Sequence, residues 1–532
     1  MNPGPVLANA AWLASGLPAA IRFQNALAEP EAAQNKWLRD TLVRHGHSEF
    51  GREHEFSGIR GAADYARKVP LSRYEDFAPY VARIASGERD VLARGPVSHL
   101  APTSGSSGPR KLIPFTPGLT AAFNAAVSPW MLDLVRQRPR LTGGPAYWSI
   151  SPPLADADDL QPSRVPTDFA DDADYLGGPR AWLVRQALAV PSSVRLVADT
   201  DTFWRLTLLA LLRRRDLRLI SVWHPSFVEL LVGAAGPAWK DLIDGVRSGE
   251  NPWSDALPLS SRTSWQSPPE PQRAAELARI GANDWPAWWP ELQVLSCWGE
   301  QAAEPGWKAL VRQLPRVLVQ AKGLLATEGV VTIPFASDRP LAVTSHYFEF
   351  LDERGDVCGA HQLERGRRYE VIVTNGGGLW RYRLGDIVEC VGHVAATPSL
   401  RFMGRDRVSD LRGEKLSEVF VAEVLRDLWT GDERPSVATL RPRHANGTAG
   451  YELLVSEDSR TRVTDLGPRL DAALSANPHY AHARRLGQLS PIAVVTVNGD
   501  ASLQSLRTQR VRIGDAKPRV LLETTPTLTK AP

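Results

Sequence analysis

Hydrophobic positions in the first 90 residues recur at the spacing of an α-helix. Leu13, Leu17 and Ile21 follow one another at intervals of four, with Trp12 next to Leu13, and a similar pattern returns between residues 37 and 42. An apolar stripe with a period near 3.6 residues is typical of a helix that packs against a core. The pattern therefore predicts a helical N-terminal region of about 90 residues, beginning with an amphipathic helix.

From about residue 90 the pattern changes to short apolar runs that alternate with helical stretches. Runs of four to eight apolar residues next to turn residues are typical of buried strands. The expected order is strand 111–116, helix 118–136, helix 202–215, strand 217–223, a helix from 226, strand 292–298, helix 307–314 and strand 316–321. This alternation predicts an α/β sheet covered by helices.

A third pattern begins at residue 346, where strands follow one another without helices. Strands are expected at 346–351, 369–374, 387–391 and 400–403, with a turn at Gly376-Gly377-Gly378. A polar stretch from 406 to 413 precedes a helix expected at 414–429. The chain is therefore predicted to have a large N-terminal domain of sheets covered by helices over 1–403, a hinge at 404–413, and a small mobile α+β C-terminal domain over 414–532.

The charge balance limits the kinds of partner. The 62 Lys and Arg nearly equal the 59 Asp and Glu, which leaves a formal charge of +3. Nucleic acid or an acidic membrane would require a basic stripe, so neither is expected. No uninterrupted apolar run reaches the roughly 20 residues of a membrane span. The first basic residue is Arg22, so the N-terminus lacks the basic region of a signal peptide. A soluble cytoplasmic protein is expected; the oligomeric state stays open.

Several common chemistries lack support in the sequence. Cys297, Cys358 and Cys390 are widely spaced, which disfavours a disulfide framework or a cysteine zinc site. No G-x-S-x-G motif is present, so a serine hydrolase is not indicated. Several histidines are isolated and lack metal-ligand spacing, which favours ordinary packed or surface imidazoles: His224, His346, His361 and His393.

The strongest local signal is a short loop rich in serine and glycine. It reads Thr103-Ser104-Gly105-Ser106-Ser107-Gly108-Pro109-Arg110-Lys111. Small hydroxylated residues let the backbone approach a polyphosphate and donate to its oxygens, and Lys111 adds a positive charge. A flexible linker could have the same composition. The loop is only nine residues long and directly precedes an apolar strand and a helix, which favours phosphate binding, although it is not a Walker A motif.

Three segments resemble the motifs of acyl-adenylating enzymes, and they occur in the family order. The loop looks like the T-S-G-[ST]-[ST]-G-x-x-K loop of these enzymes. The segment Ala326-Thr327-Glu328-Gly329 resembles their [ST]-E motif, and Tyr382-Arg383-Leu384-Gly385-Asp386 resembles Y-R-x-G-D. Phe402-Met403-Gly404-Arg405 then leads into the expected hinge. The resemblance implies the acyl-adenylate-forming fold, with ATP and Mg²⁺ as cofactors.

Within that superfamily the chain is most similar to the Gretchen Hagen family of auxin-responsive acyl acid–amido synthetases. Further matching segments are Tyr347-Phe348-Glu349-Phe350, Glu414-Lys415 at the start of the expected helix, and Lys517-Pro518-Arg519. The resemblance covers about residues 90 to 520. It implies two small-molecule partners, a carboxylic acid and an amine, with an amino acid as the expected amine.

The resemblance also implies a role for each matched residue. The phosphates and the rest of the nucleotide would be bound by Thr103, Ser104, Gly105, Ser106, Ser107, Gly108, Lys111, Thr327, Tyr382, Asp386 and Arg405. Glu328 would bind Mg²⁺, Asp386 the ribose hydroxyls, and Lys415 and Lys517 the α-phosphate. Read without the family, Asp386 is equally consistent with an ordinary turn residue, and Lys517 with a solvated surface lysine. Leu324 stands where relatives have an aromatic residue that packs on adenine.

These observations predict an ATP-dependent ligase that adenylates a carboxylic acid and forms an amide, releasing AMP and pyrophosphate. A ligase that forms a thioester with coenzyme A or a carrier protein is the alternative. A degenerate homologue that binds nucleotide without turnover is a third interpretation, and retention of Glu328 and Asp386 disfavours it. The acid pocket is expected among residues 120 to 235, with Trp223 and Phe227 as weak candidates. The 17 Trp are interpreted mainly as packing residues.

Overall fold

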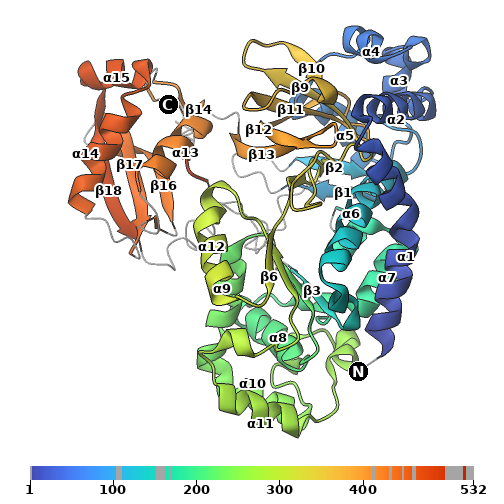
Figure 1. The fold of residues 1–532 in the computed structure, drawn as a ribbon, viewed down its shortest axis with the longest axis vertical. Coiled ribbons are helices and arrows are strands. Elements are labelled where there is room, and N and C mark those ends of the chain that lie inside the picture. Colours follow the sequence, from blue (N-terminus) through green and yellow to red (C-terminus); the bar gives the residue numbers. More distant parts are fainter. Residues whose placement is uncertain are drawn as a thin grey trace.

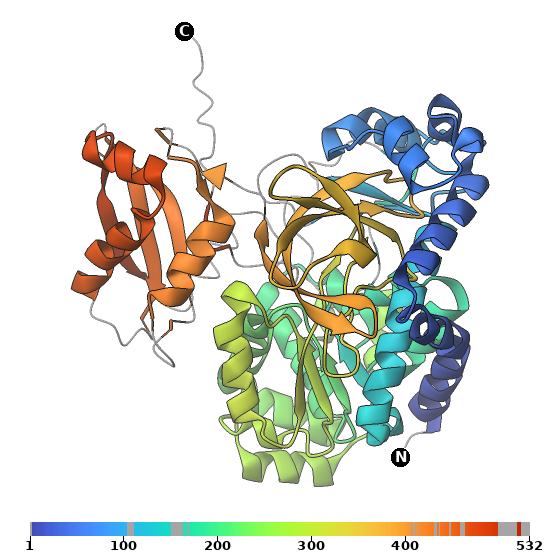
Figure 2. The ribbon, with the colours of Figure 1, turned by 45° about the horizontal axis from the view of Figure 1, so that its top comes forward.

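A large N-terminal part and a smaller C-terminal unit lie beside each other (Figures 1 and 2). The computed structural model describes residues 3–103, 111–150, 163–167, 169, 171–405, 408–409, 411–412, 414–429, 434–435, 437–445, 448–457, 463–497 and 519–522. Three hydrophobic clusters form the core of the N-terminal part and a fourth forms the core of the C-terminal unit. The predicted site residues outside these ranges are Ser104, Gly105, Ser106, Ser107, Gly108 and Lys517.

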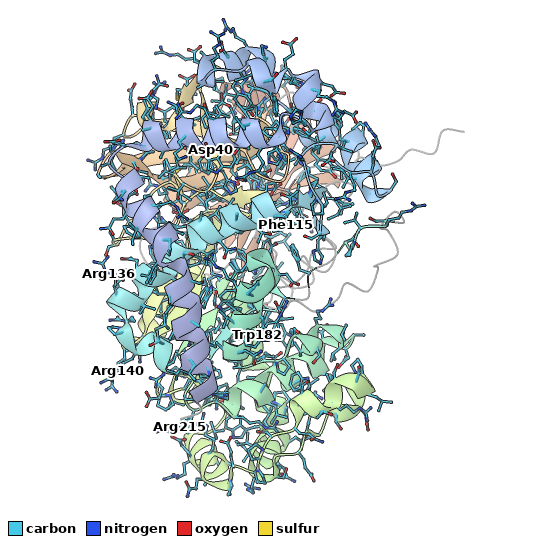
Figure 3. All side chains as sticks on the ribbon, turned by 90° about the vertical axis from the view of Figure 1, so that its right-hand side faces the viewer. Asp40, Phe115, Arg136, Arg140, Trp182 and Arg215 are labelled. Carbon is cyan, nitrogen blue, oxygen red and sulfur yellow. The ribbon has the colours of Figure 1, made fainter. Side chains whose placement is uncertain are left out.

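The N-terminal region is helical, as predicted. It contains α1 (Pro3–Ala26), α2 (Pro30–His45), α3 (Glu49–Glu53), α4 (Ala62–Lys68) and α5 (Tyr74–Ala85). By length and composition alone α1 could cross a membrane. It nevertheless buries Trp12 and Phe23 and packs along two later helices, α6 (Pro117–Gln137) and α7 (Gly178–Ala187). Leu17 and Ile21 of the predicted apolar stripe are exposed, so the stripe does not face the core at these two positions. Figure 3 shows α1 beside α7, whose Trp182 is also exposed.

A four-stranded parallel sheet lies in the lower half of the N-terminal part (Figure 1). Its order is β3 (Ala146–Trp148), β4 (Leu219–Ser221), β5 (Val294–Cys297) and β6 (Leu318–Ala321). The covering helices, besides α6 and α7, are α8 (Thr200–Leu212), α9 (Pro225–Gly233), α10 (Ala235–Ser248), α11 (Pro271–Ile280) and α12 (Glu304–Gln313). A parallel sheet needs cover on both faces, and a hydrophobic cluster lies on each. The predicted α/β region is confirmed.

Tryptophans in this region mostly pack in the core. Trp288 and Trp289 are almost fully buried, and Trp288 stacks on Trp239 with ring centroids 5.2 Å apart. Phe227 is equally buried, against Tyr147 and Trp204. The packing interpretation therefore holds for these residues, and Phe227 belongs to the core.

A five-stranded antiparallel sheet forms the upper half of the N-terminal part. Its order is β10 (Val357–Gly359), β9 (Tyr347–Asp352), β11 (Arg368–Thr374), β12 (Tyr382–Val394) and β13 (Thr397–Arg405). The run of strands was predicted, but β12 begins at Tyr382, five residues before the predicted start. Beside this sheet lies the hairpin of β1 (His99–Pro102) and β2 (Leu112–Phe115).

The glycine turn between β11 and β12 lies directly against the start of α6. A Cβ atom on Gly376 would lie 2.5 Å from the carbonyl carbon of Gly118, so no side chain fits there. The Thr116 hydroxyl donates to the Gly376 carbonyl over 2.6 Å. This contact joins the antiparallel sheet to a helix that also covers the parallel sheet.

The C-terminal unit has its own core, drawn from residues between Leu411 and Leu521. Its elements are β14 (Val408–Ser409), β15 (Leu416–Ser417), α13 (Glu418–Asp427), β16 (Ala438–Ala445), β17 (Thr448–Ser456), α14 (Val463–Leu474), α15 (Pro478–Arg485) and β18 (Leu489–Val497). The predicted helix start at Glu414 is wrong. The helix begins at Glu418 because the Ser417 hydroxyl caps it by accepting from the Phe420 N–H, while Leu416 pairs with Ser409.

Candidate active site

The two ends of the predicted phosphate loop are held together by the β1–β2 hairpin. The Thr103 N–H donates to the Lys111 carbonyl over 2.9 Å, directly after the pair Pro102 and Leu112. Residues 104–110 lie outside the described part. The Thr103 hydroxyl is buried and has no hydrogen-bond partner among the described residues. A buried hydroxyl in this position can donate to a ligand.

Lys111 is positioned by two tyrosines from distant segments. Its Nζ lies 3.5 Å from the Tyr382 hydroxyl and 5.6 Å from the centroid of the Tyr74 ring. Tyr74, the first residue of α5, accepts a hydrogen bond from the Leu112 N–H over 2.7 Å. Burial raises the pKa of Tyr382 well above its ordinary value, so its hydroxyl stays protonated at neutral pH.

Glu328 occupies the tight turn of a small hairpin between β7 (Leu325–Ala326) and β8 (Gly329–Val330). The Asn375 side chain donates to the Glu328 carbonyl over 2.7 Å. The Val330 N–H donates to His346 Nε2 over 3.1 Å. Burial lowers the pKa of His346 to about 3, so the ring is neutral and can accept. These bonds hold the turn against the antiparallel sheet.

The Glu328 carboxyl is half-buried and lies within the electrostatic reach of three other predicted site residues. Burial raises its pKa, while the positive charges of Arg405 and Lys111 lower it and the negative charge of Asp386 raises it. Thr327 is half-buried in the same turn. The fold therefore brings Lys111, Glu328, Asp386 and Arg405 together from four separate segments of the chain.

Asp386 and Arg405 are partners across β12 and β13. Arg405 Nε donates to Asp386 Oδ1 over 2.9 Å, and the two residues are opposite each other in the strand register. Asp386 lies in a strand, so the interpretation as a turn residue is wrong. Its side chain is 1% exposed, and Oδ2 has no hydrogen-bond partner among the described residues. The Asp386 charge raises the pKa of Arg405, which keeps the guanidinium positive.

The residues present fit a magnesium nucleotide. The unpartnered oxygen of Asp386 can accept from a ribose hydroxyl, and Lys111 and Arg405 can neutralise phosphate charge. No cluster of three or more His, Cys, Asp or Glu occurs in the part of the chain that is described. A single carboxylate such as Glu328 is nevertheless sufficient for Mg²⁺, which takes its other ligands from phosphates and water. Leu324 is 2% exposed, so its side chain belongs to the core.

Of the two catalytic lysines predicted for the C-terminal part, Lys415 is described, and it is not in contact with this group. Lys415 is exposed, with a backbone φ of 46°, and its carbonyl accepts from the Asn477 side chain over 3.5 Å. In the described ranges Lys415 makes no contact with Lys111, Glu328 or Asp386. Lys517 lies outside those ranges. The roles of both lysines stay predictions.

Sequence reasoning missed the residues that position the site. Tyr74, Asn375 and His346 fix Lys111 and the Glu328 turn through hydrogen bonds or ring contacts. Only Asn375 carried a usable signal, because it directly precedes the three-glycine turn. Glu349 of the Tyr-Phe-Glu-Phe segment forms a buried ion pair with Arg381, so its role in the fold is structural.

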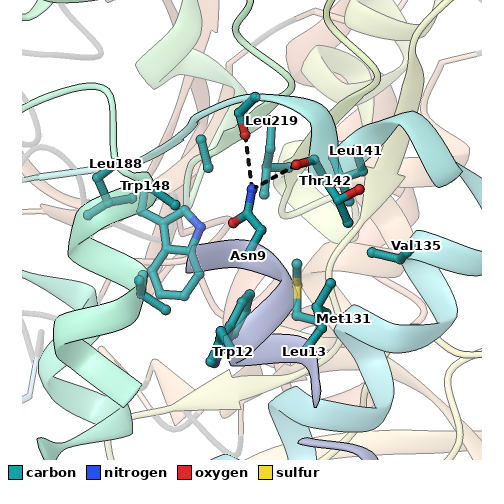
Figure 4. Close-up of a pocket in the computed structure, with 14 residues that line it drawn as sticks. Asn9, Trp12, Leu13, Met131, Val135, Leu141, Thr142, Trp148, Leu188 and Leu219 are labelled. Atoms are coloured by element: carbon teal, nitrogen blue, oxygen red, sulfur yellow. Dashed lines mark hydrogen bonds between the residues drawn. The ribbon is translucent and has the colours of Figure 1, made fainter. Parts of the chain in front are cut away.

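A separate small cavity lies between α1, α6 and β3 (Figure 4). Its volume is about 30 Å³, and its walls include Trp12, Met131 and Trp148. The Asn9 amide donates to the carbonyls of Thr142 and Gly144 over 3.3 and 3.0 Å. None of the predicted site residues lines this cavity.

Comparison with known proteins identifies the family. The sequence profile of the GH3 family N-terminal domain matches residues 19–317, and that of the GH3 family central domain matches residues 340–405. The indole-3-acetic acid-amido synthetase GH3.8 of Oryza sativa subsp. indica is 26% identical over 444 residues, which cover 78% of this chain and 72% of that protein. The 4-substituted benzoates-glutamate ligase GH3.12 of Arabidopsis thaliana is 24% identical over 372 residues, covering 65% and 64%.

Solved structures support the same fold. The AtGH3.15 acyl acid amido synthetase in complex with 2,4-DB superposes with a TM-score of 0.81 at 18% identity, over 96% of this chain and 94% of that one. A 2-hydroxyisobutyryl-CoA ligase with bound acyl-adenylate gives a TM-score of 0.50 at 14% identity, over 94% and 92%. The predicted acyl-adenylate-forming fold is confirmed. The two profiles together match more than half of the chain, which therefore belongs to the GH3 family.

Proposed function

We propose that this GH3 protein is an ATP-dependent ligase that adenylates a carboxylic acid and transfers the acyl group to an amine. The observation that carries the proposal is the convergence of Lys111, Glu328 and Asp386 from separate segments, with one Asp386 oxygen left without a partner. Together they supply a cation for phosphate, a carboxylate for Mg²⁺ and an acceptor for ribose. The amido-synthetase relatives support the same chemistry.

The proposed substrates are a small carboxylic acid and an amino acid. The relatives act on indole-3-acetic acid or on 4-substituted benzoates with glutamate, as their names state. Amide formation is favoured over thioester formation because relatives that match in sequence are amido synthetases, whereas the coenzyme A ligase matches in fold alone. We place the reaction in the cytoplasm.

In the first half-reaction a carboxylate oxygen of the acid attacks the α-phosphorus of ATP. An oxygen–phosphorus bond forms, the bond to the bridging oxygen breaks, and pyrophosphate leaves. Lys111 neutralises phosphate charge, and Tyr382 orients that lysine through its hydroxyl. Asp386 fixes the ribose so that the α-phosphate faces the acid. Glu328 would hold Mg²⁺, which would shield the charge of the phosphates.

In the second half-reaction the amine nitrogen attacks the acyl carbonyl and AMP leaves. The nitrogen loses a proton to solvent or base, which completes the amide. We assign Lys415 and Lys517 to the α-phosphate in one of the two half-reactions. Since Lys415 is exposed and remote from the nucleotide group, this role requires the C-terminal unit to rotate about the segment after Arg405.

The decisive experiment is the acid-dependent exchange of labelled pyrophosphate into ATP. A panel of aromatic and aliphatic acids should include at least one that supports exchange, and Glu328→Ala should reduce it by at least about 100-fold. Glu364→Ala is the matched control, because Glu364 is an exposed glutamate on a turn of the same sheet region. If no acid supports exchange, or if both variants lose it equally, the proposal fails.

The product class needs a separate measurement. With the best acid, AMP release should rise on addition of amino acids or hydroxylamine, and mass spectrometry should detect the amide. A rise with coenzyme A alone would assign the chain to the thioester-forming ligases instead.

A further inference from the structure

Lys322 lies at the carboxyl ends of the parallel strands, outside the nucleotide group. The strand register aligns Ser221, Ser296 and Gln320 side by side on the sheet face that α6 covers. Side chains alternate between faces, so Trp223 and Lys322, each two residues further along, lie on this same face. The carboxyl edge of an open parallel sheet is the usual place for a ligand.

Among the described residues, Lys322 is a buried cation without a close anionic partner. Its side chain is 5% exposed, and its Nζ lies 4.6 Å from the centroid of the Trp223 ring. Within the described ranges, no carboxylate lies within ion-pair distance of it. Burial lowers the pKa of its ammonium to about 8, and the more distant Asp172 opposes this shift. Most of the lysine is therefore charged at neutral pH, and a buried charge needs a partner.

The surroundings of Lys322 are partly open although they lie on a covered sheet face. Trp148, Ser221, Trp223 and Gln320 are all half-exposed. The covering helix is held above them, since the Trp130 indole donates to Gln320 Oε1 over 2.8 Å. The walls are thus aromatic and polar, and they are only partly buried.

The Lys322 cluster is electrostatically separate from the nucleotide group. The charges that act on Glu328 are those of Arg405, Asp386 and Lys111. Those that act on Lys322 are Asp172 and the Cys297 thiol. A ligand bound at Lys322 therefore does not have to be the nucleotide.

We propose that Lys322 and Trp223 bind a second acidic group on an aromatic acid substrate, at the end of the molecule opposite the reacting carboxylate. This inference rests on the proposed function. The reacting carboxylate loses its negative charge when it joins AMP, so a lysine that held it would favour the starting acid over the adenylate. A second acidic group keeps its charge through both half-reactions. The ammonium lies over the face of the tryptophan ring, 4.6 Å from its centroid, and the edge of that ring can pack against an aromatic ring of the substrate.

The test compares matched acids in the pyrophosphate exchange reaction. Benzene-1,4-dicarboxylate, benzene-1,3-dicarboxylate and 4-sulfobenzoate carry a second charge, and benzoate does not. The protein should prefer at least one doubly charged acid over benzoate. Lys322→Met should lower kcat/KM for that acid by about 10- to 100-fold, the usual effect of losing a charged hydrogen bond. The same substitution should change kcat/KM for benzoate and for ATP by less than about threefold.

Two further variants separate binding from folding. Lys322→Arg should recover part of the activity with the doubly charged acid. Lys308→Met removes an exposed lysine of α12 that pairs with Glu304. It should leave kcat/KM unchanged for both acids. If Lys322→Met lowers the melting temperature by more than a few degrees, Lys322→Gln replaces it in the same comparison. The proposal would be overturned if Lys322→Met lowered kcat/KM equally for benzoate and the doubly charged acid, or if it lowered kcat/KM for ATP alone.

Calorimetric titration of the doubly charged acid, without ATP, keeps this inference distinct from the proposed function. If no acid supports exchange but the acid binds and Lys322→Met weakens binding at least tenfold, the ligase assignment fails and the Lys322 site stands. If exchange proceeds with benzoate while no doubly charged acid binds, the ligase assignment stands and the Lys322 site is rejected.

Discussion

Buried charges in the antiparallel sheet and at the carboxyl edge of the parallel sheet have different partners. In the antiparallel sheet, buried Glu349 of β9 is paired with Arg381, which directly precedes β12, and buried Glu370 of β11 is paired with Arg383 of the neighbouring β12. The Glu349 carboxylate accepts two hydrogen bonds of 2.9 Å from Arg381. At the carboxyl edge of the parallel sheet, the one close partner of the Lys322 ammonium among the described residues is the face of the Trp223 ring.

This difference shows which buried charges serve the fold and which are left for a ligand. A buried carboxylate whose oxygens are all satisfied contributes a fixed internal contact. Asp386 is intermediate, because one oxygen is paired with Arg405 and the other has no partner in the described part. Substitutions in paired positions should therefore reduce stability, and those in unpaired positions should reduce substrate binding.

The largest expected effect is on stability, from breaking the Glu349–Arg381 pair. Glu349→Ala leaves a buried guanidinium without its carboxylate, which should lower the free energy of unfolding by about 3–5 kcal/mol. Urea unfolding followed by circular dichroism measures this change. Glu389→Ala is the control, because its partner Arg401 is 46% exposed and the pair should contribute less than about 1 kcal/mol. Similar losses for the two variants would contradict the comparison.

The next effect is on nucleotide binding. Asp386→Asn keeps the size of the side chain but removes the charge that would accept from ribose, so KM for ATP should rise about 10- to 100-fold. Pyrophosphate exchange at varied ATP measures it, with exposed Asp356→Asn as control. An unchanged KM for ATP would mean that the ribose binds elsewhere and that the unpaired oxygen of Asp386 does not bind the nucleotide.

A loss of stability that grows with acidity is also expected, because two buried histidines must stay neutral. His346 accepts from Val330, and His45 accepts from the Arg94 N–H over 2.9 Å. Burial lowers their pKa values from 6.5 to about 3 and about 4. The unfolded chain therefore binds more protons below pH 6.5, so stability is complete above that pH and falls as the pH decreases toward 4. Each histidine contributes a slope of about 1.4 kcal/mol per pH unit.

Denaturant unfolding between pH 7.5 and 4.5 tests this slope. His346→Gln can still accept a hydrogen bond but does not titrate, so it should flatten the curve. His47→Gln, at an exposed position, should leave the curve unchanged. A wild-type curve that is flat over this range would show that the histidines are not neutral acceptors.

The smallest effect is expected at the contact between the antiparallel sheet and the C-terminal unit. Arg368 of β11 pairs with Glu423 of α13, and both side chains are about one third exposed or less. Glu423→Gln should change the free energy of unfolding by less than about 1 kcal/mol, as is usual for partly exposed pairs. Scanning calorimetry measures it. A loss comparable to that of Glu349→Ala would mean that this contact belongs to the paired core.

Much of the fold could be predicted because the spacing and the length of the apolar segments in the sequence matched those of the observed helices and strands. The run of apolar residues at 217–223 gave β4, and the sequence around Tyr369 gave β11 with almost the right ends. The order of motifs also predicted that Glu328 and Asp386 share a site, and the Coulomb interaction between their charges agrees with it.

Other features could not be predicted because they depend on contacts between distant segments. Glu414 and Lys415 have helical propensity, but the β14–β15 pair and the Ser417 cap delay the helix to Glu418. The role of Tyr74 depends on its contacts with Leu112 and Lys111, and no local pattern encodes it. Lys322 resembles any strand-end lysine until its burial is known.

The position of Arg405 limits how this chain could be joined to a different C-terminal unit. Arg405 is the final residue of β13 and also the partner of Asp386. A chimera spliced before Arg405 would remove that partner and alter the ribose site along with the exchanged unit. Splicing after Arg405 keeps the ion pair, so it is the earliest junction at which the C-terminal unit could be exchanged without disturbing the carboxylate of Asp386.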